Sequence, residues 1–539
     1  MAATSEDFDF IIVGAGSAGC IVANRLSADG RATVLLLEAG PSDWHPFLRI
    51  PLGYAHSFND AKVNWRYASE PEPGLGGRVA YVPRGRVLGG SSTINALVYA
   101  RGQAQDFDGW AAEGNPGWAW ADVLPFYRKL EDHPLGPGPM HGQGGPVAIS
   151  DVSADAHPLC RSFIDASAEV GFAYNPDLNG ESTEGIGHYQ VTARKGRRSS
   201  TARAYLAPAR GRANLTIATA AQATRLLMEG SRIVGVEYRR HGAIRTAKAR
   251  REVVVSAGAI NTPQLLMLSG LGPAAHLRGH GIAVAQDLPA VGQHLQDHIG
   301  FDIFYKSRVP SINSSLATFG GKLAAGLDYL LRRRGILAMS MNQAGGFVRT
   351  ALADGRPDLQ LYFCPVAYTK PPAGSPKFVT IDPEPAFSLS GSPCRPKSRG
   401  SITLKSAEPL APPAIRLNLL EDPADMEVAL AGFDVLRRIG NASGLATLSS
   451  ESRPGAALVA REEIAAYLRQ EAYSIFHPCG SCRMGPDPRS AVVDSRLRVH
   501  GVQGLRLVDA SIFPSVPSGN TNAPSMLVGE MGAAAILAG

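Results

Sequence analysis

The sequence predicts an α/β protein of two domains, a Rossmann-like domain and a substrate domain built on an antiparallel sheet flanked by helices. Three observations lead to this prediction. Residues 8–40 have strand–helix–strand order with a Gly-x-Gly-x-x-Gly turn after the first strand. The chain has 539 residues, which is too long for one simple core. Residues 300–461 alternate strand-like segments with proline-rich loops, as a separate sheet domain would.

The N-terminal unit begins with an apolar run, Phe8–Val13, that predicts a buried strand. A helical pattern follows from Ser17 to about Leu26, and a second strand, Thr33–Leu37, ends on Glu38. The helix would present free N–H groups and its positive dipole end, which suit a pyrophosphate. A carboxylate at position 38 would accept hydrogen bonds from a ribose and repel a 2′-phosphate, so we expect NAD or FAD rather than NADP.

Three glycines give the first turn its expected shape. Gly14 permits the tight turn, Gly16 lets a pyrophosphate approach the backbone, and Gly19 lets the helix pack closely on the strand. A lone glycine motif is weak evidence. Here it coincides with a strand, a helix, a second strand and a terminal acid, and together these features predict a dinucleotide site.

Composition argues against several classes of protein. Hydrophobic residues make up 45% and charged residues 19% of the chain, the net charge is only +6, and we identify no nucleic-acid-binding module. No apolar run approaches the roughly 18 residues of a membrane span. The segment MAATSEDFDF lacks the basic and apolar regions of a secretory signal. Six cysteines do not make a disulfide scaffold, so we expect a cytoplasmic protein.

Two further turns are expected to approach the dinucleotide. Gly89-Gly90-Ser91-Ser92 precedes an apolar run and predicts a glycine-rich turn that opens a helix. Later, the strand Glu252–Ser256 and the small residues Ala257 and Gly258 lead to a helix that we expect from about Pro263 to Gly270. Between these turns we expect a small antiparallel meander with strands at Leu215–Ala218, Ala223–Met228 and Ile233–Tyr238.

Both domains are predicted to be discontinuous in sequence. The dinucleotide-binding domain would take residues 1–155, 201–299 and 466–539, and the substrate domain residues 156–200 and 300–465. Within the latter we expect strands at Asp358–Phe363 and Gly400–Leu404. Two helices are expected there, at about Asp425–Arg438 and Arg461–Gln470.

Several patterns admit a functional reading and a structural one. His294 and His298 are four residues apart, but no third metal ligand lies near them, so we favour structural roles and predict no metal. His141 lies in a Gly/Pro-rich connection and is also more often structural than catalytic. Cys479 and Cys482 form a single C-x-x-C, which could be a redox dithiol or half a zinc site, and we favour two structural thiols.

The most promising reactive groups lie in the last third of the chain. His477 stands before a proline in the glycine-rich loop IFHPCGSCRMG. Asn520 follows a strand, Asp509-Ala510 and a Pro/Gly-rich loop, and a helix is expected from about Ala523 to Leu537. A lone histidine is more often structural than catalytic, so the case for His477 depends on its neighbours.

Five ordered segments together resemble the GMC (glucose–methanol–choline) oxidoreductases. They are GAGSAG with Glu38, GRVLGGSSTIN at Gly85–Asn95, GAINTPQLLMLSGLG at Gly258–Gly272, HPCGSCRMG around His477, and RVHGVQGLRLVDASIFP with GNTNAP near the end. The resemblance spans nearly the whole chain. It implies a p-hydroxybenzoate-hydroxylase-like fold, bound FAD and oxidation of an alcohol, and bacterial choline, sorbose and alkanol dehydrogenases look most similar.

The resemblance also implies roles for individual residues. His477 corresponds to the catalytic histidine and Asn520 to its partner. The residues expected at FAD are Gly14, Gly16, Ser17, Ala18, Gly19, Glu38, Ala39, Trp65, Arg84, Gly85, Leu88, Gly89, Gly90, Ser91, Asn95, Ala96, Leu97, Val98, Ala223, Ala257, Gly258, Asp509, Ala510, Asn520, Thr521 and Asn522. Ile94 stands where members with histidyl-linked FAD carry histidine, so we expect non-covalent FAD.

The expected chemistry is removal of a proton from the alcohol oxygen by neutral His477 and of a hydride from its carbon by flavin N5. Two alternatives use the same scaffold, a flavin-containing lyase and a flavin-binding protein without chemistry, and the presence of both His477 and Asn520 argues against the second. The sequence leaves open which alcohol is used, whether oxygen or a quinone or dye accepts the electrons, and the oligomeric state.

Overall fold

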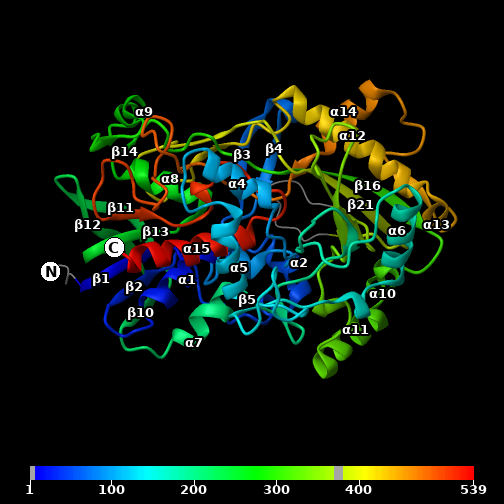
Figure 1. Ribbon diagram of the computed structural model, residues 1–539, viewed down its shortest axis with the longest axis horizontal. Coiled ribbons are helices and arrows are strands. Elements are labelled where there is room, and N and C mark those ends of the chain that lie inside the picture. Colours follow the sequence, from blue (N-terminus) through cyan, green and yellow to red (C-terminus); the bar gives the residue numbers. More distant parts are fainter. Residues whose placement is uncertain (1–5, 370–379) are drawn as a thin grey trace.

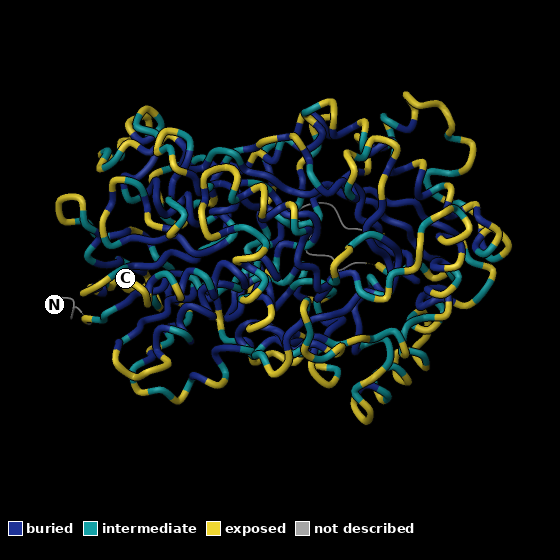
Figure 2. Tube along the Cα trace, viewed as in Figure 1, coloured by how far each residue is buried: buried dark blue, intermediate teal, exposed yellow. Residues whose placement is uncertain are grey.

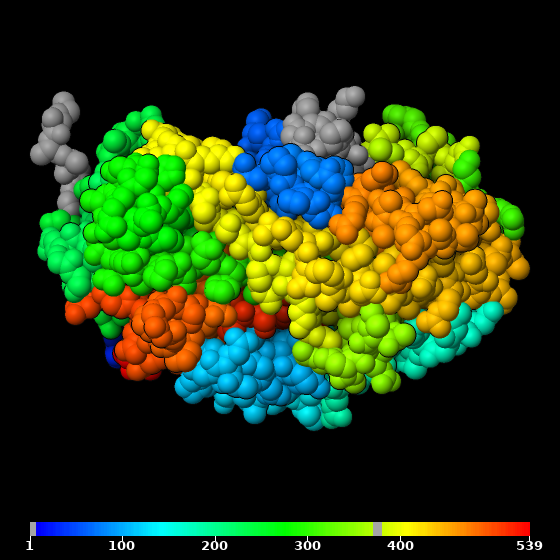
Figure 3. All heavy atoms as spheres, turned by 90° about the horizontal axis from the view of Figure 1, so that it is seen from above, coloured from blue at the N-terminus to red at the C-terminus, as the bar shows by residue number. Residues whose placement is uncertain are grey.

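Two β-sheets organise the structure, a computed structural model that describes residues 6–369 and 380–539. Figure 1 shows β1, β2 and β10–β13 at one end of the long axis, with both chain termini, and β16 and β21 at the other end. Seen from above in Figure 3, bright green and dark orange residues lie at the left end of the molecule and light orange residues at the right end.

The first sheet has seven strands in the order β10-β2-β1-β13-β12-β11, with β26 also paired to β13. Strands β10, β2, β1 and β26 run parallel to their neighbours, and Phe10 of β1 pairs with Val34 of β2. The bounds are β1 Glu6–Val13, β2 Val34–Leu37, β10 Leu215–Ala218, β11 Ala221–Glu229, β12 Arg232–Arg240, β13 Ala243–Val255 and β26 Leu505–Leu507. Parallel order brings the carboxyl ends of five strands to one edge.

Three helices bring their N-termini toward that edge: α1 (Ser17–Leu26), α8 (Gly258–Leu268) and α15 (Asn522–Leu537). Helix α1 packs on β1 and β2, and α15 packs on α1. A Cβ at Gly529 would lie 3.0 Å from Ala18, so glycine allows this close approach. Buried Glu530 of α15 pairs with Arg25 of α1 at 2.6 Å, which ties the two helices together.

The second sheet is antiparallel, with the order β17-β18-β21-β16-β24 and β25 paired to β16. Its strands are β16 Ile299–Ser307, β17 Ala344–Val348, β18 Leu359–Cys364, β21 Ala386–Pro393, β24 Ser449–Arg453 and β25 Tyr473–Ser474. Helix α12 (Pro423–Gly440) packs on β21 and β16, and α6 (Pro158–Glu169) packs on α12 and β17. This sheet and its helices match the antiparallel domain that the sequence predicts.

Shorter elements connect the sheets. The remaining helices are α2 Tyr54–Ser57, α3 Ser91–Ile94, α4 Ala104–Ala112, α5 Trp120–Leu130, α7 Ala207–Ala209, α9 Ala274–Gly279, α10 Ile312–Ala317, α11 Phe319–Arg332, α13 Ser443–Ala446 and α14 Arg461–Glu471. Small strand pairs include β3 Tyr67–Glu72 with β4 Arg78–Val82 and β22 Ser401–Thr403 with β23 Ala414–Arg416. Within the described ranges, no helix is both long enough and apolar enough to cross a membrane.

Two local predictions differ from the structure. Strand β10 does not belong to the antiparallel meander but pairs in parallel with β2, while the meander consists of β11, β12 and the first part of β13. Helix α8 begins at Gly258, and Pro263 lies inside it. Proline has no N–H for the carbonyl of Ala259, and the Ser481 hydroxyl donates to that carbonyl instead, at 2.5 Å.

One continuous core supports both halves. A single cluster of buried apolar side chains includes Val13 and Val254 of the first sheet and Phe301 and Leu361 of the second. Figure 2 shows the buried parts of the chain running through the interior from one end to the other, with exposed residues gathered in outer loops and turns. The two sheets are therefore held together by packing, and a site between them has a firm frame.

Gly19→Ala is expected to lower the free energy of unfolding by about 1–3 kcal/mol, because a Cβ at Gly19 would lie 1.9 Å from the Gly14 carbonyl oxygen. The measurement is the melting temperature of the variant by calorimetry. Gly109→Ala in α4 is the control, since nothing lies within 4 Å of its added Cβ and alanine favours a helix. A Gly19→Ala protein as stable as the parent would contradict close packing at this turn.

Candidate active site

A channel of about 1160 Å³, partly open to solvent, follows the carboxyl edge of the first sheet. Gly14, Glu38 and Ser256 come directly after β1, β2 and β13, and Asp509 follows β26. Asp509 is buried and accepts hydrogen bonds from the Gly258 backbone N–H (2.9 Å) and the Thr262 hydroxyl (2.6 Å), which fixes the start of α8 beside the channel. Strand ends and helix N-termini thus meet along one groove, as expected for a dinucleotide site.

Two glycine turns lie against each other in this channel. The Gly89 N–H donates to the Ala15 carbonyl at 2.7 Å, and a Cβ on Gly90 would lie 2.7 Å from the Cα of Gly16. At Gly16 a Cβ would have only one neighbour within 4 Å, the Ser256 carbonyl at 3.8 Å. A side chain at Gly90 would therefore prevent the two turns from packing together. The space beside Gly16 itself stays open toward the channel.

Glu38 is buried at the end of β2 and holds the turn around it. Its two carboxylate oxygens accept hydrogen bonds from the backbone N–H groups of Ala15 (3.0 Å) and Gly40 (2.8 Å). Burial raises the pKa of this carboxyl to about 7, against the lowering effect of the two N–H donors. Additional hydrogen-bond donors from a ligand would favour the ionised carboxylate.

A second cavity, of about 1530 Å³ and also partly open, adjoins the channel. Five residues line both spaces: Ser17, Arg84, Ser91, Thr521 and Ser525. Ser17 and α15 also meet directly, because the Ser17 hydroxyl donates to the Asn522 side-chain oxygen at 2.8 Å. His477 and Asn520 line this second cavity, and the residues that follow them, Pro478 and Thr521, line the channel, so the predicted reactive pair lies near the junction of the two spaces.

His477 is positioned by His298. The two Nδ1 atoms are 3.0 Å apart, and His298 Nε2 lies 2.9 Å from the Cys394 carbonyl oxygen. Because a carbonyl only accepts, His298 Nε2 carries a proton, and burial lowers the pKa of His298 to about 4, so its Nδ1 is unprotonated near neutral pH. His477 must then donate from Nδ1, which leaves the lone pair on its Nε2.

Asn520 faces that lone pair. Its amide nitrogen lies 3.2 Å from His477 Nε2, and its oxygen accepts from the Gln360 amide at 3.2 Å, which orients the group. Burial, together with neighbouring His298 and Arg84, lowers the pKa of His477 well below 6.5. The result is a neutral, half-buried imidazole with one basic nitrogen beside the cavity.

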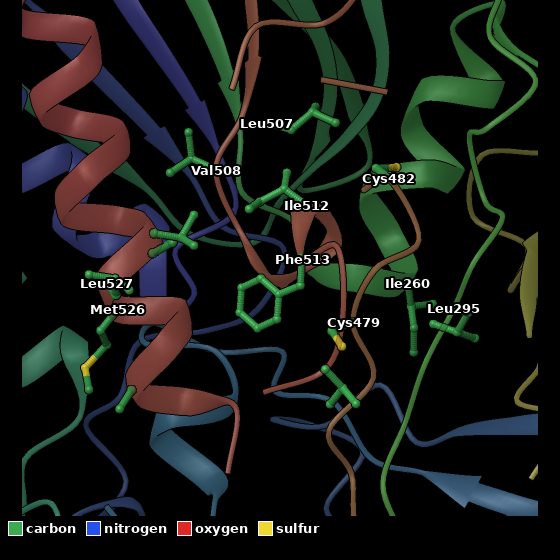
Figure 4. Packing of buried hydrophobic residues seen from close by; sticks show 14 of the residues in the cluster. Ile260, Leu295, Cys479, Cys482, Leu507, Val508, Ile512, Phe513, Met526 and Leu527 are labelled. Atoms are coloured by element: carbon green, nitrogen blue, oxygen red, sulfur yellow. The ribbon is translucent and has the colours of Figure 1, made fainter. Parts of the chain in front are cut away.

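The loop that carries His477 is anchored on both sides. The Cys479 N–H donates to the Gln296 carbonyl (2.9 Å), and the Cys482 N–H donates to the Ser511 carbonyl (2.8 Å). Figure 4 shows Cys479 and Cys482 in an apolar cluster with Ile512 and Phe513. Burial raises the pKa of both thiols, and both cysteines are free, which fits the structural role favoured from the sequence.

The structure brings most of the predicted residues to these two spaces. The channel is lined by Gly14, Gly16, Ser17, Ala18, Glu38, Ala39, Trp65, Arg84, Gly85, Gly90, Ser91, Ala223, Ala257, Gly258, Asp509, Ala510 and Thr521. The cavity is lined by Asn95, Ala96, Leu97, Val98, His477, Asn520 and Asn522. Gly19, Leu88 and Gly89 line neither space. The two glycines allow close packing at their turns, and Leu88 is a buried core residue.

A separate cluster, His133, His141 and Asp177, brings potential metal ligands within 4.8 Å of one another. The two imidazoles stack in parallel with ring centroids 3.7 Å apart. His141 already binds Asp177 (2.7 Å) through Nε2, and His133 Nε2 binds the Gln190 side chain (3.1 Å). Coordination would have to break these bonds, so the geometry supports the structural role expected for His141.

Comparison with known proteins identifies the family. The GMC oxidoreductase models match residues 8–300 and 396–529. The chain belongs to the GMC oxidoreductases. A Pseudomonas putida protein named alcohol dehydrogenase (acceptor) is 43% identical, covering 98% of this chain and 96% of that one. A Brucella ovis protein named oxygen-dependent choline dehydrogenase is 41% identical, covering 97% and 94%. The crystal structure of pyridoxine 4-oxidase from "Mesorbium loti" is 31% identical, with a TM-score of 0.87 and 98% of both chains covered.

Membership confirms the predicted fold class, FAD as cofactor, and FAD-dependent oxidation of an alcohol with transfer of electrons to an acceptor. The lyase alternative is not favoured. The channel fits FAD on structural grounds as well. The Ser256 hydroxyl is buried in the channel wall without a hydrogen-bond partner, and the backbone at Gly16 leaves space where a diphosphate can approach.

Sequence reasoning missed several residues of this GMC site. It treated His298 as an ordinary structural histidine, and it gave no role to Gln360 or to the Cys394 carbonyl. Tyr362, whose buried hydroxyl has no hydrogen-bond partner, also lines the cavity. His298 carried a signal, since it ends the segment VGQHLQDH just before an apolar strand, whereas Gln360 lies inside a strand that reads simply as core.

Glu38→Gln is expected to weaken FAD retention and lower the melting temperature. A glutamine oxygen can accept from only one of the two N–H groups at Ala15 and Gly40, and its NH₂ faces the other, so about 1–3 kcal/mol is lost. The measurement is the FAD-to-protein ratio after repeated gel filtration, with exposed Glu229→Gln as control. Full FAD retention by Glu38→Gln would contradict the proposed ribose end of the channel.

Proposed function

We propose that His477 is the catalytic base of alcohol oxidation and that Asn520 orients the substrate oxygen. The observation that carries this proposal is the hydrogen-bond chain from the Cys394 carbonyl through His298, which puts the His477 lone pair on Nε2 beside the cavity. Asn520 cannot take a proton near neutral pH, but its amide can donate to an oxygen.

The substrate oxygen would replace the contact between Asn520 and His477. Their 3.2 Å separation is at the upper end of the hydrogen-bond range, and an alcohol can bond to both groups at once. Its oxygen accepts from the Asn520 amide, and its hydroxyl proton passes to His477 Nε2 as the carbonyl product forms. FAD, when bound, supplies the acceptor for the hydride that leaves the alcohol carbon.

Several finer assignments belong to the same proposal. The predicted residues lining the channel would hold FAD without a covalent link, since position 94 carries the apolar side chain of Ile94. Oxygen or a quinone or dye would accept the electrons. A cytoplasmic location is supported by six buried free thiols. The domain division at residues 155, 200, 299 and 465 is supported in part by the two sheets, because β1, β2, β10–β13 and β26 fall in the predicted dinucleotide-binding segments. Residue 465 lies inside α14, and β25 pairs with β16 of the antiparallel sheet, so the sheets favour a last boundary after Ser474.

His477→Ala is expected to keep the fold and FAD but to slow flavin reduction by alcohol about 10²–10⁴-fold, the usual contribution of a general base. The measurement is anaerobic stopped-flow bleaching of the flavin. His241→Asn is the control, because His241 lies exposed in a turn with a φ of 50° that asparagine tolerates. Reduction of His477→Ala at the parent rate would remove the catalytic assignment.

The pH dependence of the parent enzyme gives a second readout of the same base. Because the pKa of His477 is lowered below 6.5, the neutral form persists through neutral pH and is lost only as pH falls through that lowered value. The rate of flavin reduction should therefore be flat near pH 7 and above and fall on the acid side, below 6.5. A rise in rate between pH 7 and 9 would contradict this ionisation.

His298 acts on catalysis through His477 and is a positioning residue. His298→Leu should slow flavin reduction at least about tenfold, because the His477 Nδ1 proton loses its acceptor and the lone pair is no longer held on Nε2. His298→Asn should restore much of the rate, since its side-chain oxygen can take the place of Nδ1 as acceptor. Equal rates for the two variants would show that His298 only fills space.

A further inference from the structure

We propose that this enzyme oxidises an uncharged, apolar alcohol, aliphatic or aromatic, and discriminates against cationic amino alcohols such as choline. The proposal rests on the assignment of His477 as base, because it concerns the cavity next to that residue. It differs from the substrate that the names of the relatives would suggest, since relatives called choline dehydrogenases are 41–42% identical to this chain.

The wall of the cavity is mainly apolar. It includes Phe58, Ile94, Leu97, Met341, Ile475 and Phe476. Among the described residues of the lining, Arg84 carries the only charged group, and the neutral polar groups include the Tyr362 hydroxyl, which is buried and has no hydrogen-bond partner. Burying a hydrocarbon group of the substrate against such a surface is favourable for binding. A neutral oxygen of the substrate can still accept a hydrogen bond from a hydroxyl of the wall.

The carboxylates nearest the cavity lie outside its described lining, so a bound cation would have no direct anionic partner there. No aspartate or glutamate belongs to its lining within residues 6–369 and 380–539. Asp302 lies behind Tyr473, whose hydroxyl donates to it at 2.8 Å. Asp297 is buried and accepts from the Ser474 hydroxyl (2.5 Å) and the His477 N–H (2.8 Å). Among the described lining residues the one guanidinium, Arg84, repels a bound cation, and nearby Asp297 offsets part of that charge.

Aromatic rings could still attract a quaternary ammonium group, and the cavity has several, including Tyr54, Tyr368 and Tyr473. Cation–π attraction is modest compared with the cost of moving an unpaired charge out of water. With Arg84 nearby and no carboxylate in the described lining, the balance favours a neutral substrate. The same rings are good contacts for an alkyl or aryl group.

A matched pair of alcohols tests charge at constant shape. Choline and 3,3-dimethylbutan-1-ol differ only in having nitrogen or carbon at the branched centre. Flavin reduction in the FAD-loaded enzyme is followed anaerobically with these two, with hexan-1-ol and benzyl alcohol, and with sorbitol as an uncharged but polar alcohol. We expect the best apolar alcohol to exceed choline and sorbitol at least about 100-fold in the ratio of reduction rate to dissociation constant.

The outcomes separate the two proposals. Choline reducing the flavin as well as or better than its neutral isostere overturns charge discrimination and leaves His477 in place. Sorbitol as the best substrate overturns the apolar part of the proposal. If no alcohol reduces the flavin, the proposed function itself fails, independently of any selectivity.

Asn342→Asp provides the reverse test within the protein. Asn342 lines the cavity, and its side-chain oxygen accepts from the Cys364 thiol at 2.7 Å, a role that aspartate keeps. The variant adds one negative charge at nearly constant shape, so the preference should move toward choline at least about tenfold. Asn342→Leu, of similar size but uncharged, should not move it that way. An unchanged ratio in Asn342→Asp, with FAD content intact, would contradict the electrostatic argument.

Discussion

The hydrogen bond from His298 to the Cys394 carbonyl determines the protonation pattern of the site. It forces the proton of His298 onto Nε2, so that Nδ1 accepts from His477 and the His477 lone pair faces Asn520. A backbone carbonyl cannot change between donor and acceptor, unlike a hydroxyl or an imidazole. The proposed base is therefore oriented by a rigid group that lies on the far side of His298 from His477.

This chain of hydrogen bonds also explains why the site needs both halves of the molecule. Cys394 follows β21 and His298 precedes β16, both of the antiparallel sheet, and Gln360 on β18 holds Asn520. The loop of His477 is tied to the segment after β26 of the parallel sheet through the Cys482 N–H. Relative movement of the two sheets would break the alignment, and their continuous core resists it.

The sequence predicted those parts of the structure that depend on local chemistry. The turn from Gly14 to Gly19, the acid at Glu38 and the helix α15 follow from backbone sterics, charge and periodicity over a few residues. The pairing of β10 with β2 and the true start of α8 depend on distant partners, respectively β2 itself and Ser481. Gln360 was not predictable, because its role arises only when Asn520, 160 residues away, is folded against it.

The low polarity of the cavity serves the proposed chemistry in two ways. Burial destabilises a positive charge on His477 and so keeps its Nε2 free to take a proton at neutral pH. For the same reason, an apolar wall whose described residues include no carboxylate destabilises a positive charge on the substrate. A carboxylate in the lining that could bind a cation would also stabilise protonated His477 and raise its pKa. An environment that keeps the proposed base neutral therefore disfavours binding of a cationic alcohol. The lining of this cavity has the properties that keep His477 neutral.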